Sequence, residues 1–268
     1  MYDFGYTKPS SLADAVAALA GDDEAKALAG GQTLLASMKL RLSSAEQLVD
    51  LAGIKELTGI CRDGDALVIG AMTRHQDVAN NAEVQKNIPA LAELAGGIGD
   101  RQVRAMGTLG GSVANNDPAA CYPSAVLALN ATVHTNKRKI AADDYFQGMY
   151  TTALEAGELI TAISFPIPKR ASYAKFRQPA SRFALVGVFV VDTGSGVRVA
   201  ITGAGNGVFR HAGLEAALSK DFSAKAVDAV TVDSADLNSD LHASAEYRAH
   251  MIKVQTQRAV THSLSHGH

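Results

Sequence analysis

The chain has 268 residues, 47% of them hydrophobic, and its mean hydropathy is +0.03. This length buries one large core or two modest ones, and the composition is too apolar and too weakly charged for a disordered chain. Lysines and arginines number 25 against 27 aspartates and glutamates, so the chain lacks the strong basic charge of a nucleic-acid-binding protein. Its two cysteines, Cys61 and Cys121, are too few for a disulfide framework or for an iron–sulfur cluster with four thiolate ligands.

Neither a signal peptide nor a membrane span is visible in the sequence. The first residues, MYDFGYTKPSS, lack a basic segment followed by an apolar one. The longest apolar run, 183–191, is half the length that a bilayer span needs. We therefore expect a cytoplasmic protein without a membrane span.

The first sixty residues alternate short helices and strands. Ser10 or Ser11 caps a helix with an apolar face over 12–19, and Gly21 closes it. Further elements are predicted as a strand over 26–29, a helix over 34–42 and a strand over 48–50. This βαβ rhythm predicts a small α/β lobe.

From Leu57 to Ala71 the pattern changes to that of a β-hairpin, with Asp63-Gly64 at its tight turn. A glycine-rich segment runs from Gly96 to Gly111. The other predicted elements of this part are helices over 75–79 and 88–94, a helical or buried run over 125–129, and a strand over 159–165 that Pro166 and Pro168 stop.

Residues 166–171, PIPKRA, are the predicted linker. Beyond them we predict strands over 172–177, 185–192 and 197–202, and a long helix over 243–260. Strands followed by helices predict an α+β C-terminal domain of about a hundred residues.

Two glycine-rich segments, both predicted as loops, carry the strongest chemical signal. AGGQT (29–33) lies between a predicted strand and helix, and TLGGS (108–112) continues to Asn115, Asn116 and Asp117. Consecutive glycines allow the backbone to approach a ligand closely and to direct N–H groups at one anion. Two such segments in one half of the chain suggest a pyrophosphate held from two sides, and so a nucleotide cofactor that bridges two lobes.

Other motifs favour plainer interpretations. GAGNG (203–207) begins like a dinucleotide fingerprint, but Val208 replaces the third glycine and no βαβ unit surrounds it, so a tight turn after a strand is favoured. His75 fits the start of a helix better than a ligand role. His242 and His250 are eight residues apart and could share a helix face, but no third ligand is apparent.

A specific resemblance is carried by AGGQTLLASMKLRL (29–42), IGDRQVRAMGTLGGSVANNDPAACYPSAVLALNATV (98–133) and HASAEYRAHMIKVQTQRAV (242–260). These stretches resemble the flavoprotein medium subunit of molybdenum hydroxylases. That family includes the carbon monoxide dehydrogenase medium subunit and the FAD domain of xanthine dehydrogenase. The resemblance covers essentially the whole chain in the same order, including ITAISFPIP (160–168) and YAKFRQPASRFALVG (173–187).

The resemblance implies an α+β fold in two domains. A two-lobed FAD-binding domain (PCMH-type) is expected over 1–168, with lobes over about 1–57 and 58–168. A C-terminal α+β domain of the carbon monoxide dehydrogenase flavoprotein type, a small antiparallel sheet plus helices, is expected over 169–268.

The resemblance also implies which residues bind FAD. In this family the two glycine segments hold the diphosphate and the ribityl chain. The first segment places Ala29, Gly30, Gly31, Gln32, Thr33 and Leu34 at the cofactor. The second places Thr108, Gly111 and Ser112 there, with Asn115 and Asp117 just after it.

Further implied contacts lie outside the two glycine segments. Ile98 and Gly99 match the pair beside the isoalloxazine ring, and Leu159 or Ile160 lies near the adenine-side apolar contact. Arg177 falls where many relatives place a lysine near the flavin, and a cation there stabilises the N1–C2 carbonyl region of the reduced ring.

Cys121 departs from the family pattern, because relatives often carry an acidic residue there that accepts bonds from a nucleotide hydroxyl. A thiol is a poor acceptor. Either Asp117 or water takes that role, or this part of FAD is held more loosely; a buried small hydrophobic role for Cys121 is the plainer reading. Arg101 and Arg104 could contact the flavin phosphates or a partner subunit, and a solvated or interface role fits them equally well.

The function implied is that of the FAD-binding subunit of a heterotrimeric molybdenum hydroxylase. Its expected partners are a large molybdopterin-binding subunit and a small subunit with two 2Fe–2S clusters, assembled as a dimer of heterotrimers without nucleic acid. Substrate oxidation then occurs at molybdenum in another chain, and this chain passes electrons from a cluster through FAD to a terminal acceptor. We expect no catalytic acid, base, nucleophile or metal ligand in it.

Two alternatives remain open at the level of sequence. The chain could be a stand-alone flavin oxidoreductase with its own substrate pocket, although no cap domain is evident beyond the C-terminal hundred residues. It could also be a non-enzymatic binding or assembly protein that keeps the fold without flavin, although its glycine segments are intact.

Overall fold

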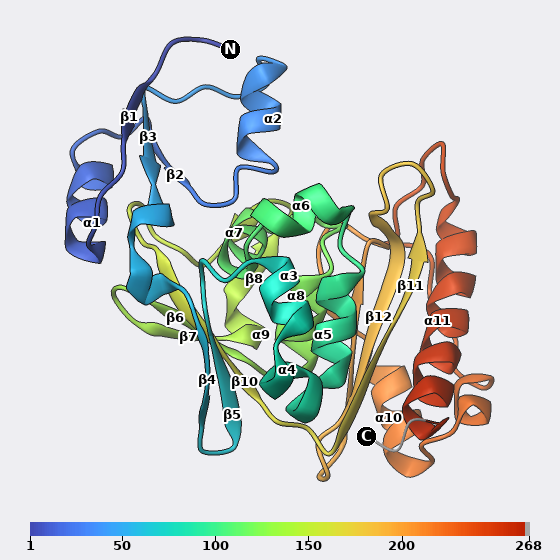
Figure 1. Cartoon of the computed structure of the whole chain (residues 1–268). Helices are drawn as coiled ribbons and strands as arrows, with labels where there is room; N and C mark the ends of the chain where they lie inside the picture. The colour runs from blue at the N-terminus through green and yellow to red at the C-terminus, as the bar shows by residue number, and fades with distance from the viewer. Residues whose placement is uncertain (266–268) are drawn as a thin grey trace.

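The computed structural model describes residues 1–265. Its N-terminal lobe is a small parallel sheet with a helix on either side (Figure 1). The strands are β1 (Gly5–Thr7), β3 (Gln47–Asp50) and β2 (Ala25–Leu28), in that order. Helices α1 (Leu12–Ala20) and α2 (Leu34–Lys39) connect them, and the turns η1 (Leu51–Gly53) and η2 (Lys55–Leu57) lead out of the lobe. The predicted α/β lobe is confirmed, with Ser11 as the N-cap of α1.

A five-stranded antiparallel sheet follows, in the order β4-β5-β10-β6-β7. Its strands are β4 (Ile60–Asp63), β5 (Ala66–Gly70), β10 (Ile160–Pro166), β6 (Thr132–Thr135) and β7 (Lys139–Ala141). The predicted hairpin is present, but Asp63 pairs with Ala66, so Gly64 and Asp65 form its turn. The turn lies one residue later than predicted because Gly64, with φ +58°, supplies the positive φ at the first central position.

A layer of short helices covers one face of this sheet. It contains α3 (His75–Asn80), α4 (Ala82–Asn87), α5 (Pro89–Gly96), α6 (Arg101–Met106), α7 (Leu109–Asn115) and α8 (Tyr122–Ala128). Helix α9 (Ala142–Tyr145) and the small hairpin β8 (Phe146–Gly148) and β9 (Thr151–Thr152) complete this part. Helix α4 was not predicted, because its sequence AEVQKN buries only Val84 and carries almost no apolar periodicity.

The C-terminal part is a four-stranded antiparallel sheet backed by helices. Its elements are β11 (Arg170–Arg177), β12 (Ala184–Asp192), β13 (Val197–Thr202), β14 (Phe209–Arg210), α10 (Ala212–Lys220), η3 (Ala224–Val227) and α11 (Ala245–Ser265). The predicted linker shrinks to 167–169, since β10 and β11 extend into it. GAGNG (203–207) is the predicted turn after β13, and His242 precedes α11, so it shares no helix with His250.

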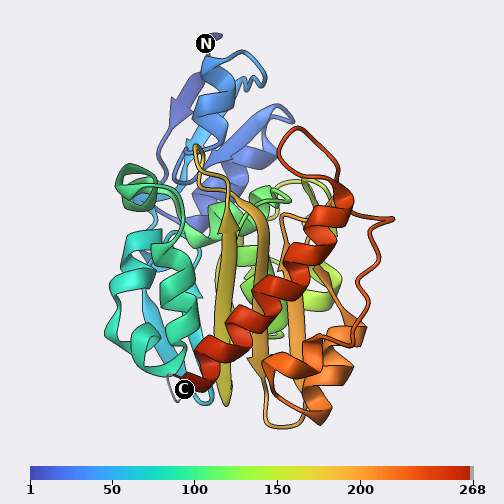
Figure 2. The same cartoon turned by 90° about the vertical axis from the view of Figure 1, so that its right-hand side faces the viewer.

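These parts form four layers: sheet, helices, sheet and helices (Figure 1). The outer helix α11 crosses the C-terminal sheet obliquely (Figure 2). The largest core runs through the inner layers without a break, because Phe189, Val191 and Ala200 of the C-terminal sheet belong to the same buried cluster as Leu91 and Phe165. No helix within 1–265 is long and apolar enough to cross a membrane.

Candidate functional site

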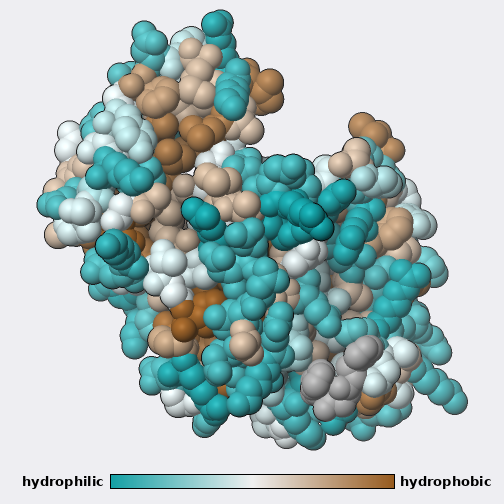
Figure 3. Space-filling model, in the orientation of Figure 1, coloured by the Kyte–Doolittle hydropathy of each residue, from teal (hydrophilic) through white to brown (hydrophobic). Residues whose placement is uncertain are grey.

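A cavity of about 500 Å³ lies where the N-terminal lobe, the helix layer and the tip of the β11–β12 hairpin meet. The space-filling view shows the molecule hollowed between the N-terminal lobe and the opposite upper edge, with hydrophobic residues on the lobe side of the hollow (Figure 3). The cavity is therefore lined by β2, β10 and β11, one strand from each of the three larger sheets, and by the helix layer, rather than by one lobe.

Every cofactor-binding residue predicted from the sequence except Arg177 lines this cavity. The residues that do so are Ala29, Gly30, Gly31, Gln32, Thr33, Leu34, Ile98, Gly99, Thr108, Gly111, Ser112, Asn115, Asp117, Leu159 and Ile160. The fold thus brings together segments that are up to 131 positions apart in the chain, from Ala29 to Ile160.

The first glycine segment packs against the end of α6, just before the second glycine segment. A Cβ on Gly30 would lie 2.3 Å from the Met106 carbonyl oxygen and 2.6 Å from the Gly107 Cα. Gly31 adopts φ +69°, which L side chains rarely adopt. Gly30 is therefore required because the two backbones approach too closely for any side chain, and Gly31 is required because of its positive φ.

The second segment is not the loop that the sequence suggested. Thr108 caps α7, and its Oγ1 accepts a hydrogen bond from the Gly111 N–H at 3.2 Å. Gly110 and Gly111 therefore lie in the first turn of a helix. A Cβ on Gly110 would lie 2.5 Å from the Ala71 Cβ, so this glycine allows α7 to pack directly on the end of β5.

The β8–β9 hairpin holds the residues that follow α7. Asn116, with φ +44°, donates from Nδ2 to the carbonyl oxygens of Gly148 and Thr151, both at 2.8 Å. Asp117 accepts from the Ala119 N–H at 2.8 Å and from the Tyr150 hydroxyl at 3.3 Å. Burial of Tyr150 and its contact with Asp117 raise the pKa of that phenol. This support could not be predicted from the sequence, because the hairpin pairs only through strands of three and two residues.

One end of the cavity carries basic side chains. Lys175 donates from Nζ to the Gly97 carbonyl oxygen at 3.0 Å and to the Cys121 Sγ at 3.3 Å. Arg182, at the hairpin tip, donates to the Gly99 carbonyl oxygen at 3.3 Å. We name Lys175, Arg182 and the turn 97–99 the basic end of the cavity.

Of the two cations on this part of β11, Lys175 lines the cavity and Arg177 does not. Arg177 still lies close by, because its Nη2 comes 3.7 Å from where a Cβ on Gly97 would lie. The pairing of β11 with β12 shifts register between Phe176 and Arg177. Lys175 is a lining residue that the sequence did not single out.

Arg104 stabilises the basic end from outside. Its Nη1 donates to the carbonyl oxygens of Ile98 and Gly99, at 3.0 and 3.1 Å, and so holds the turn in which Gly99 adopts φ +49°. Cys121 is 5% exposed, which fits the buried role expected of it, and it also accepts the hydrogen bond from Lys175.

The opposite end of the cavity is apolar. Leu51, Met72 and Leu159 line it and belong to one buried cluster of the N-terminal lobe, against which Ala27 and Ala29 pack. We name this group the apolar end.

His75 begins α3, as predicted, but it also lines the cavity. It is 4% exposed, and its Nδ1 is buried without a hydrogen-bond partner. Burial, followed by the nearby Arg104 charge, lowers the pKa of His75 to about 4. The ring is therefore neutral near pH 7. Within residues 1–265, no three His, Cys, Asp or Glu side chains gather as a metal site.

Comparison with known proteins identifies the family to which this chain is similar. Residues 2–168 match the family model described as the FAD binding domain in molybdopterin dehydrogenase. The chain is 38% identical to the carbon monoxide dehydrogenase medium chain of Afipia carboxidovorans, over 96% of this chain and 95% of that one. It is 34% identical to the nicotine 6-hydroxylase medium subunit of Paenarthrobacter nicotinovorans, over 95% of each.

A solved structure agrees with these relatives. The model superposes on a chain of reconstituted CO dehydrogenase from Oligotropha carboxidovorans with a TM-score of 0.91, at 34% identity and over 98% of both chains. The resemblance drawn from the glycine segments is thereby confirmed. This chain belongs to the family of FAD-binding subunits of molybdenum hydroxylases, and it is an oxidoreductase component whose cofactor is FAD.

Proposed function

We propose that this chain relays electrons from 2Fe–2S clusters of a partner subunit, through its FAD, to a terminal acceptor. The observation that carries the proposal is that one subunit architecture serves unlike substrates. The relatives described above belong to enzymes named for carbon monoxide and for nicotine, at 38% and 34% identity to this chain. A subunit shared by such different chemistries suits electron transfer better than substrate recognition.

The cavity fits FAD by the chemistry of its parts. Gly30, Gly31, Gly110 and Gly111 line the cavity without side chains, so a diphosphate can approach their backbone closely. The basic end suits the isoalloxazine ring, whose pyrimidine edge gains negative charge on reduction. The apolar end suits the neutral adenine. Bound FAD supplies a centre that takes up electrons from a metal cluster and passes them on.

The chain's own residues bind and orient this cofactor. The Lys175 ammonium, held by the Gly97 carbonyl and the Cys121 thiol, has no carboxylate among these bonds to neutralise it. Its positive charge is therefore available to stabilise negative charge on the reduced ring. Arg182 adds a second cation from the hairpin tip, and Phe183 beside it helps to cover the cavity.

We further propose the quaternary arrangement that the family implies. In it, a large molybdopterin-binding subunit carries substrate oxidation and a small subunit carries two 2Fe–2S clusters, in a dimer of heterotrimers. Within the chain, we propose a boundary at residue 168 between the FAD-binding domain and the C-terminal domain.

Purification through this chain from its native host tests the proposal. We expect FAD, molybdenum and iron to co-purify with the chain, together with one larger and one smaller subunit. A flavin-loaded chain that elutes alone, without molybdenum or iron, would favour a stand-alone flavin oxidoreductase. Acid-released flavin identifies the cofactor in either case.

A further inference from the structure

The apolar end of the cavity is held by a residue that does not line it. Asn136, in the turn between β6 and β7, accepts a hydrogen bond at Oδ1 from the Leu159 N–H at 2.8 Å. Its own N–H donates to the Leu159 carbonyl oxygen at 3.0 Å. Both backbone polar groups of Leu159, a lining residue, are therefore satisfied by one asparagine 23 positions earlier.

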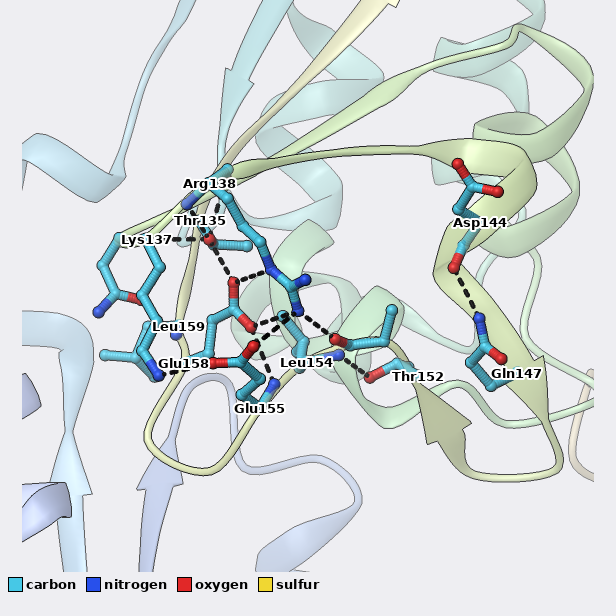
Figure 4. Close-up of polar contacts among 12 residues, drawn as sticks. Thr135, Lys137, Arg138, Asp144, Gln147, Thr152, Leu154, Glu155, Glu158 and Leu159 are labelled. Atoms are coloured by element: carbon cyan, nitrogen blue, oxygen red, sulfur yellow. Dashed lines mark hydrogen bonds and ion pairs between the residues drawn. The ribbon is translucent and has the colours of Figure 1, made fainter.

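The residue before Leu159 is held just as firmly (Figure 4). Glu158 has a side chain with 0% exposure, and its carboxylate accepts from Arg138 Nε and Nη2, both at 3.1 Å. It also accepts from the Thr135 hydroxyl at 2.6 Å and the Glu155 N–H at 2.8 Å. These bonds, above all those from Arg138, lower the pKa of Glu158 to about 2, so the carboxylate stays ionised at physiological pH.

Hydrogen bonds from the turn 135–138 thus hold the whole segment 153–159 in place. Arg138 Nη2 also donates to the Ala153 carbonyl oxygen at 2.7 Å. Leu154, Glu158 and Leu159 of that segment line the cavity, whereas Thr135, Asn136 and Arg138 do not. The turn 135–138 can therefore affect a bound cofactor only by positioning segment 153–159, part of which lines the cavity.

We propose that Asn136 is a positioning residue that gives the cavity its affinity for the adenylate half of FAD, by fixing the backbone of Leu159 at the apolar end. The inference rests on FAD as the cofactor of this cavity. The basic end, with Lys175 and Arg182, lies beyond the glycine segments and belongs to the flavin half. The turn 135–138 therefore affects binding of the adenylate and leaves binding of the flavin ring unaltered.

Three substitutions separate this role from a general structural one. Asn136→Leu keeps the approximate size but removes the acceptor, which leaves the Leu159 N–H without its partner. Asn136→Asp retains an acceptor oxygen at the same place. Lys137→Ala is the matched control, because Lys137 is the next residue in the same turn and its side chain makes only an exposed ion pair with Glu155.

The experiment measures three dissociation constants on the full-length chain freed of flavin, by calorimetry with FAD, ADP and riboflavin. In Asn136→Leu we expect the affinities for FAD and ADP to fall about tenfold, the usual cost of one unmatched buried hydrogen bond. Riboflavin affinity stays within about twofold. Asn136→Asp restores FAD and ADP binding, and Lys137→Ala leaves all three unchanged.

The outcomes against the proposal are distinct. Equal losses for FAD, ADP and riboflavin would show that Asn136 merely stabilises the fold, and unchanged FAD and ADP affinities would show that the turn does not act on the cavity. A loss for riboflavin alone would reverse the assignment of the two ends. If Asn136→Leu does not fold, Thr135→Val, which removes one donor to Glu158, is tested for the same selective pattern. Failure of the unsubstituted chain to bind FAD would instead refute the cofactor itself.

Discussion

At the scale of single residues, His75 makes stability depend on pH. Its pKa is about 4 in the folded chain against 6.5 as an ordinary value, because it is buried and lies near Arg104. Between these pH values the unfolded chain binds a proton that the folded chain does not, so the free energy of unfolding falls as the pH falls from 6.5 to 4. The contribution is about 3 kcal/mol, fully present above pH 6.5 and lost near pH 4.

We therefore predict that His75→Leu flattens the acid limb of the stability profile. Urea unfolding at pH 7.5 and pH 4 measures the difference, with the exposed His250→Leu as the control. The wild-type chain and the control lose about 3 kcal/mol more than His75→Leu over this range. Identical pH dependence in all three proteins would mean that His75 stays protonatable in the folded state.

Because their surroundings differ, we predict different effects on the free energy of unfolding when Gly110 and Gly96 are each replaced by alanine. A Cβ on Gly110 would lie 2.5 Å from the Ala71 Cβ and 2.8 Å from the Ala71 carbonyl oxygen, whereas a Cβ on Gly96 meets only the Ala79 Cβ, at 3.7 Å. We expect Gly110→Ala to lower the free energy of unfolding by about 1–3 kcal/mol. Gly96→Ala, in helix α5, is neutral or raises it by up to about 1 kcal/mol. Equal effects in thermal unfolding would contradict the close packing of α7 on β5.

Some single residues of the site could be predicted from the sequence and others could not. The pair Gly30 and Gly31 predicted a close backbone approach, because few other roles require adjacent glycines between a strand and a helix. Lys175 was not singled out, because alternation along a strand places Lys175 and Arg177 on the same face and the sequence does not show which of the two reaches the cavity.

At the scale of elements, the first glycine segment packs against the end of α6 in the lining of the cavity. Gly30→Ala places a methyl group 2.3 Å from the Met106 carbonyl oxygen, so the two segments must separate. We expect FAD affinity to fall by about tenfold to a hundredfold, the equivalent of an overpacking cost of about 1–3 kcal/mol.

The control for this prediction is Gly21→Ala at the end of α1, where a Cβ lies at an ordinary 3.5 Å from the Ala17 carbonyl oxygen. The flavin-to-protein ratio and equilibrium titration with FAD measure the effect. Full flavin retention in Gly30→Ala would show that the two segments are ordinary turns with no part in cofactor binding.

Elements with a strong local pattern were predicted well. Helix α1 has a serine cap, an apolar face and a closing glycine. Strand β12 is a nearly continuous apolar run, and β13 is mostly apolar apart from Arg198 and Thr202. Helix α7 was taken for a loop because adjacent glycines disfavour a helix locally, and packing of Gly110 on Ala71 overrides that preference. The β8–β9 hairpin could not be predicted from the sequence pattern, since its strands have only three and two residues.

At the scale of the whole molecule, the C-terminal sheet supports a wall of the cavity. Thr202, at the end of β13, is fully buried, and its hydroxyl lies 2.9 Å from the Pro118 carbonyl oxygen and 2.7 Å from that of Ala120. The Gly203 N–H donates to the Pro118 oxygen as well, at 2.7 Å. Ala120 lines the cavity, so the last sheet of the chain holds a segment that faces the cofactor.

We predict that Thr202→Val destabilises the chain by about 1–3 kcal/mol, because it leaves the Ala120 carbonyl oxygen buried without that partner. Thr202→Ser retains the hydroxyl and most of the stability. Urea unfolding with and without FAD measures both variants, and we expect Thr202→Val to bind FAD more weakly as well. Indistinguishable stabilities for the valine and serine variants would contradict the account.

This coupling of distant parts could not be predicted from the sequence. Periodicity located the strands and the long helix, yet nothing local indicates that Thr202 meets residues 82 and 84 positions earlier. The predicted linker also does not indicate that the main core continues past it to Phe189 and Val191 of β12.

The most direct test of the central claim is anaerobic reduction of the flavin, followed in its visible absorbance band. In the complex purified through this chain, adding the organic substrate, screened among aldehydes and N-heterocycles, is expected to bleach the flavin rapidly. The isolated FAD-loaded chain is expected to stay yellow with the same substrate and to bleach only with dithionite. Rapid bleaching of the isolated chain by the substrate would contradict the relay and assign substrate oxidation to this chain itself.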